Sequence, residues 1–105
     1  MKTLGEAVAA GKHPKTWKFK FPGNYTVTCK IVSARHKKLE NAEGMFYGFG
    51  PVATLDQSEK HATIFFSAGM TTARFLHVYF HEMGHSQIEW SGAYHNDLME
   101  LLEAK

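Results

Sequence analysis

The sequence predicts one small α+β domain: a three-stranded sheet packed on a long helix, with a shorter helix near each end of the chain. Three segments have the alternating or continuously apolar pattern of strands, at 25–32, 45–55 and 61–67. Helical patterns are expected at 3–11, 72–90 and 95–104. The chain has 105 residues, of which 44% are hydrophobic. These values fit a single domain spanning 1–105 with a modest core.

The N-terminal segment 1–24 is expected to be basic and partly irregular. Its short helix is stopped by Gly11 and Pro14, and 13–24 should end in a turn at Pro22-Gly23-Asn24. From Tyr25 to Val32 apolar and polar residues alternate, which predicts a half-buried strand. In the second strand segment, glycines and a proline at 48–51 indicate a bulge or a sheet edge.

The most specific feature is His81-Glu82-Met83-Gly84-His85, the pattern H-E-x-x-H. At about 100° per residue, two histidines four positions apart lie on one helix face, one turn from each other. Both imidazoles can then reach one zinc ion, and Glu82 can act as the general base toward a water on the metal. The preceding run 75–80 is apolar, as in a buried helix, where His and Glu need the partners that a metal supplies. The alternative is a helix that merely exposes two histidines and a glutamate.

A catalytic zinc usually has three protein ligands and a water, so the motif needs a third ligand. His77 and Glu89 extend the same face, but each lies ~12 Å along the axis from the farther motif histidine, too far for one ion. A stop signal at Ser91-Gly92 is expected to end the helix and turn the chain back. His95 follows at once on the inward face of the final helix, and it is the predicted third ligand.

Charge is unevenly distributed along the chain. Residues 1–38 contain nine Lys/Arg and one Glu, a net charge of +8, whereas 39–105 contain three Lys/Arg and nine Asp/Glu, a net charge of −6. Basic residues mixed with aromatics suit a nucleic-acid surface, because they neutralise phosphates and offer faces for stacking. The alternatives are a solvated face, or a basic half docked on the acidic half of the fold. The candidate nucleic-acid contacts are Lys15, Lys18, Lys20, Arg35, Lys37 and Lys38.

The single cysteine, Cys29, cannot form an internal disulfide. It favours a reducing, cytoplasmic location, and it is expected in a buried strand rather than as an inhibitory thiolate on a metal. No run of the sequence approaches membrane-spanning length, so no membrane partner is expected.

The order of elements resembles the zincin metallopeptidase core, and within it the SprT-like (Spartan) group. In this order, strands are followed by a helix with H-E-x-x-H, then by a turn and a further histidine. The resemblance covers about 45–105 and is carried by Ala62-Thr63-Ile64-Phe65-Phe66-Ser67, His81-Glu82-Met83-Gly84-His85 and His95-Asn96-Asp97-Leu98. It implies that His81, His85 and His95 bind one Zn²⁺ and that Glu82 is the general base. It also implies a peptide substrate laid along an edge strand near 60–67.

The predicted function is therefore a zinc-dependent metallopeptidase that hydrolyses peptide bonds through a zinc-bound water. Its substrates would be peptides or proteins, including proteins associated with nucleic acid. Tyr94 is a candidate oxyanion stabiliser, as are Tyr47 and His61. The alternatives are a non-catalytic zinc- or nucleic-acid-binding module that keeps the zincin shell, and a structural interaction protein in which the histidines coincide by chance.

Overall fold

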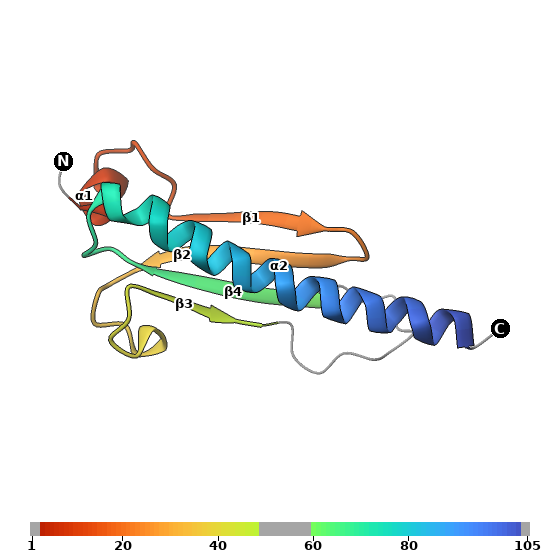
Figure 1. Cartoon of the computed structure of the whole chain (residues 1–105). Helices are drawn as coiled ribbons and strands as arrows, with labels where there is room; N and C mark the ends of the chain where they lie inside the picture. The colour runs from red at the N-terminus through yellow and green to blue at the C-terminus, as the bar shows by residue number, and fades with distance from the viewer. Residues whose placement is uncertain (1–2, 49–59, 104–105) are drawn as a thin grey trace.

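The computed structural model describes residues 3–48 and 60–103, which form a four-stranded mixed sheet with a long helix across one face (Figure 1). The elements in chain order are α1 (Leu4–Ala9), β1 (Thr16–Phe21), β2 (Tyr25–Val32), the 3₁₀ turn η1 (Lys37–Leu39), β3 (Gly44–Tyr47), β4 (Lys60–Ser67) and α2 (Thr72–Glu103). The strand order is β1-β2-β4-β3, with β2 and β4 parallel and the two outer pairs antiparallel. The α+β class is confirmed, but the sheet has four strands where three were predicted.

The additional strand is β1, in the segment that was expected to be irregular. Thr16–Phe21 alternates between exposed and half-buried positions and pairs with β2 along its whole length, from Thr16↔Lys30 to Phe21↔Tyr25. Pro14 and Pro22 lie just outside the strand and not within it. Proline is tolerated beside a strand because it then removes no hydrogen bond from the ladder. The turn predicted at Pro22-Gly23-Asn24 is confirmed and joins β1 to β2.

The second correction concerns the end of the long helix. A break was predicted at Ser91-Gly92, followed by a separate helix, but α2 runs without interruption from Thr72 to Glu103. Tyr94, two residues after Gly92, packs on the β1–β2 turn: a Cβ on Gly23 would lie 2.7 Å from its ring, and the ring meets Tyr25 edge-on at 6.4 Å. The helix continues because this tertiary contact outweighs the local stop signal, which is worth about 1 kcal/mol.

The remaining predicted elements agree with the structure where it describes them. The strands predicted at 25–32 and 61–67 correspond to β2 and β4, and the short N-terminal helix corresponds to α1. The second predicted strand begins as β3, and its part at 49–55 lies outside the described residues. None of the helices in the described ranges combines the length and the apolar character needed to cross a membrane.

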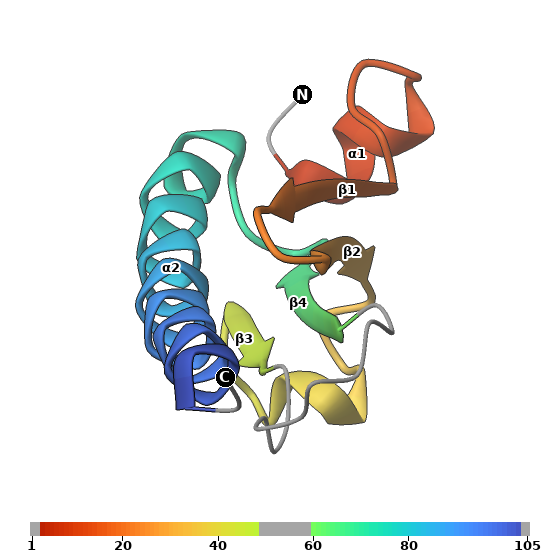
Figure 2. The same cartoon turned by 90° about the vertical axis from the view of Figure 1, so that its right-hand side faces the viewer.

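Alternation along the strands gives the sheet two different faces. Figure 2 shows α2 lying along one side of the sheet. On that side the sheet contributes a fully apolar core, to which α2 adds Phe75 and Val78 and α1 adds Leu4. The sheet residues of this core are Tyr25, Val27, Cys29, Ile31, Ala62, Ile64 and Phe66, each at most 3% exposed. The alternate residues of each strand therefore point away from α2.

Candidate metal centre on helix α2

The two motif histidines lie together on the exposed side of α2. Their Nε2 atoms are 3.1 Å apart and their ring centroids 4.6 Å apart. Two nitrogens bound at ~2 Å to one tetrahedral zinc would be separated by about 3.3 Å. The geometry of His81 and His85 therefore fits two ligands of a single metal ion.

Glu82 lies on the adjacent side of the helix and is 7% exposed. Its carboxylate faces the start of β3: a Cβ built on Gly44 would be 3.2 Å from Glu82 Cγ and 3.5 Å from its Oε1. Within the described part of the chain no hydrogen bond or ion pair to this carboxylate is present. Burying a carboxylate without a partner is energetically costly. The contacts around Glu82 do not offset this cost, so stability alone does not explain why a glutamate is buried at this position.

A pocket of about 290 Å³ brings His81 and Glu82 together with side chains that the sequence did not predict for this site. Glu43, just before β3, accepts a hydrogen bond from Arg74 Nε at 3.1 Å, and His77 lines the same pocket. The Glu43–Arg74 pair joins residues 31 positions apart. Such a contact depends on how β3 docks against α2, so no local pattern could have indicated it.

The predicted third ligand, His95, is not brought to the histidine pair. His95 is exposed on the same uninterrupted helix, ten residues after His85, which corresponds to about 15 Å along the axis. Among the residues that the structure describes, no group of three or more His, Cys, Asp or Glu side chains is placed to hold a metal ion. Two of the three predicted ligands are therefore assembled in this conformation.

The three candidate oxyanion stabilisers all lie away from the histidine pair. Tyr94 packs on Gly23 at the β1–β2 turn and stacks on Trp90 at 5.6 Å. Tyr47 and His61 occupy strand positions that point to the face opposite α2, and the Tyr47 hydroxyl donates to the Lys38 carbonyl at 2.7 Å. The structure therefore does not bring any of them to the pocket that holds Glu82.

Cys29 occupies the buried strand position that the alternation predicted. It is fully buried in β2, on the face under α2, and burial raises its pKa to about 12. A thiol in this environment stays protonated at neutral pH and does not act as a metal ligand.

The six basic residues predicted to contact nucleic acid are divided among three places. Lys18 and Lys20 are exposed on β1, on the sheet face opposite α2. Lys15 lines a separate pocket just before β1. Arg35, Lys37 and Lys38 lie in and before η1. The sequence reading omitted Lys30, which shares the sheet face of Lys18 and which the alternation of β2 could have revealed.

Comparison of the chain with protein-family models, with curated proteins and with solved structures finds no match. The likeness to the SprT-like group therefore depends on the residues of the motif and their order along the chain.

Proposed function

We propose that the protein is a zinc-dependent peptidase whose ion is held by His81 and His85. The observation that carries this proposal is the 3.1 Å separation of the two Nε2 atoms next to the buried Glu82 carboxylate, which has no partner among the described residues. When bound, zinc would supply Lewis acidity and a water of lowered pKa. Glu82 would accept the proton of the attacking water on a carboxylate oxygen and pass it to the leaving amine.

The peptide would add to the outer edge of β3. β3 pairs with β4 on one side only, and in the described ranges no strand pairs with its other edge. Gly44 at the start of β3 is in contact with Val78 and Glu82, so a peptide on this edge would pass beside the proposed base. The strand that the resemblance implied for this role, β4, is excluded because it is hydrogen-bonded on both sides, to β2 and to β3.

His95 can complete the ligand set only if α2 opens near Gly92. Opening would undock Tyr94 from Gly23 and Tyr25, and a third zinc ligand would have to offset that loss. Gly92 is exposed and has no neighbouring atoms around its Cβ position, so replacement by alanine is sterically free. Glycine costs a helix about 1 kcal/mol relative to alanine, and Gly92→Ala would therefore strengthen the straight helix by that amount.

The first experiment measures zinc affinity with a chromophoric chelator on protein prepared without a histidine tag. We expect one zinc per chain, and loss of tight binding in His81→Ala and in His85→Ala. If His95 joins the site, His95→Ala will weaken binding and Gly92→Ala will weaken it about fivefold. Gly84→Ala is the matched control, because Gly84 is also a helical glycine with open space around it. Unchanged affinity in both Gly92→Ala and His95→Ala would remove His95 from the ligand set.

A second experiment separates metal binding from catalysis. Glu82→Gln should keep zinc but lose cleavage of a quenched fluorescent peptide library, because an amide cannot accept the proton. Glu89→Gln is the control, since Glu89 lies on the same helix but packs its carboxylate against Gly48. Equal cleavage by Glu82→Gln and the unmodified protein would refute Glu82 as the base. Absence of stoichiometric zinc would refute the whole proposal.

A further inference from the structure

The sheet face opposite α2 carries lysines, threonines and aromatic residues and no carboxylate in the described strands. Register places Lys18, Thr28, Thr63 and Tyr47 in one row across the four strands, and Thr16, Lys30, Phe65 and Met45 in the next. Lys18, Lys20 and Lys30 are exposed, while Phe65 and Tyr47 are half-buried. The glutamates near the sheet lie elsewhere: Glu82 and Glu89 face β3 from α2, and Glu43 is paired with Arg74. The described strands therefore carry only positively charged side chains on this face.

The aromatic residues of this face form a connected platform. His36 stacks on Phe65 with ring centroids 5.5 Å apart and planes 21° apart, and Tyr47 meets Phe65 edge-on at 5.7 Å. Lys38 Nζ lies 5.1 Å from the centre of the Tyr47 ring, while the Tyr47 hydroxyl donates to the Lys38 carbonyl. The rings are therefore fixed in position, with His36 stacked on Phe65 and the Lys38 cation over Tyr47.

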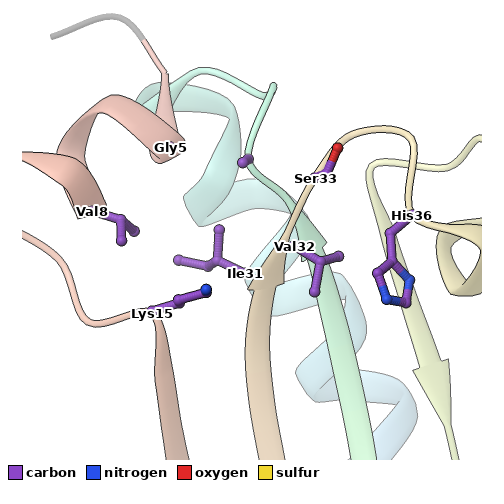
Figure 3. Close-up of a pocket in the computed structure, with 8 residues that line it drawn as sticks. Gly5, Val8, Lys15, Ile31, Val32, Ser33 and His36 are labelled. Atoms are coloured by element: carbon purple, nitrogen blue, oxygen red, sulfur yellow. The ribbon is translucent and has the colours of Figure 1, made fainter.

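A cavity continues this surface at the C-terminal end of β2. It has a volume of about 340 Å³ and is lined mainly by apolar side chains, with Lys15 and His36 among its polar residues. Figure 3 shows Lys15 on one side of Ile31 and Val32 and His36 on the other. Because His36 also stacks on Phe65, the cavity and the aromatic platform share a wall.

We propose that this face, hereafter the basic sheet face (Lys18, Lys20, Lys30, Lys38, Tyr47 and Phe65), binds single-stranded nucleic acid. The lysines neutralise phosphates, and unpaired bases stack against the rings of Phe65 and Tyr47 where His36 and Lys38 leave them uncovered. A single strand fits better than a duplex, because the rings lie in a shallow sheet surface and a paired base cannot expose its plane to them. The proposal does not rest on the metal site, which lies on the other side of the sheet.

The experiment is fluorescence anisotropy with a labelled oligothymidylate and a duplex of the same length, at several salt concentrations. We expect the single strand to bind more tightly than the duplex, and its affinity to fall with salt. Lys18→Gln and Lys30→Gln should each reduce the slope of log K against log salt by about 0.7. Lys12→Gln is the matched control, because Lys12 is an exposed lysine of the same basic segment but follows α1, away from the sheet.

Stacking is tested with Phe65→Leu, which keeps an apolar side chain but removes the ring. Loss of one stacked base should weaken binding about 5- to 100-fold. Circular dichroism and thermal unfolding of each variant verify that the fold is intact, and addition of a zinc chelator should leave binding unchanged. The proposal is overturned by absence of binding at low salt, by equal effects of Lys12→Gln and Lys18→Gln, or by unchanged binding in a folded Phe65→Leu variant. Loss of binding on chelation would also overturn it, while leaving the peptidase proposal standing.

Discussion

The two faces of the sheet have opposite physical characters although they are built from alternate residues of the same strands. On the face under α2 the side chains are apolar and almost completely buried. On the other face they are lysines, threonines and half-exposed rings. Helix α2, which covers the apolar face, carries the histidine pair on its exposed side and Glu82 at its contact with β3, whereas the lysines are on the open face of the sheet.

This difference means that neighbouring residues on one strand should affect different measurements. A change on the covered face should act through packing and therefore through the free energy of unfolding. A change on the open face should act through binding and leave stability nearly unaltered. Each of the following predictions tests how completely the two faces are separated.

The largest effect is expected from the neighbouring pair Phe66 and Phe65 in β4. Phe66 has no exposed surface and contacts the rings of Trp17, Phe75 and Tyr79, so Phe66→Ala should destabilise the fold by about 3–5 kcal/mol. Phe65 lies on the basic sheet face and is half-buried, so Phe65→Ala should cost about 1 kcal/mol. Urea unfolding followed by circular dichroism measures both. Equal losses of stability would mean that the open face is packed as tightly as the covered one.

A smaller effect is expected where β3 touches α2. A methyl group on Gly44 would lie 2.7 Å from Val78 Cγ1, so in Gly44→Ala either the Val78 side chain or β3 must shift, and we expect β3 to move away from the helix. Overpacking of this kind costs about 1–3 kcal/mol. The same shift would move the strand edge from Glu82, so peptide cleavage should fall by more than zinc affinity. Gly84→Ala, which meets no atoms, should be neutral or stabilising in the same urea titration. A Gly44→Ala variant as stable as the unmodified protein would contradict the close contact.

The predicted features that the structure confirms are those that depend on local sequence. Alternation located β2 and β4, and the spacing of four residues placed His81 beside His85. The incorrect predictions depended on contacts between distant parts of the chain. Gly92 is a sound local stop signal, but Tyr94 reaches Gly23, about seventy positions earlier, and keeps the helix straight.

The order of the strands in the sheet could not be predicted from a local sequence pattern either. Nothing in the sequence of β4 indicates that it lies inside the sheet, because this position results from its pairing with β2 on one side and β3 on the other. The prolines around β1 were interpreted as a sign of irregular chain, although they only bracket the strand. The Glu43–Arg74 pair likewise exists only after β3 has docked on α2.

The smallest predicted effect is on the pH dependence of the free energy of unfolding. It is linked to the Cys29 thiol and tests how well the covered face of the sheet excludes water. Burial raises the thiol pKa from 9.0 to about 12. The folded state therefore binds a proton that the unfolded state releases, and the stability linked to this thiol is complete below pH 9 and is lost as the pH rises toward 12. At pH 10 the loss should be about 1 kcal/mol, since one pKa unit corresponds to 1.36 kcal/mol.

Cys29→Ala removes the titrating group, and its cavity cost is the same at every pH. The difference in unfolding free energy between the two proteins should therefore shrink by about 1 kcal/mol between pH 8 and pH 10. The pKa of Tyr79 is raised first by burial and then by the charge of Cys29. The effect of burial is the same in both proteins and cancels from the difference, and the effect of Cys29 requires an ionised thiol, which the folded protein does not have between pH 8 and pH 10. A difference that stays constant with pH would mean that the Cys29 thiol has an ordinary pKa. Water would then reach β2 beneath α2, and the covered face of the sheet would not be sealed from solvent at Cys29.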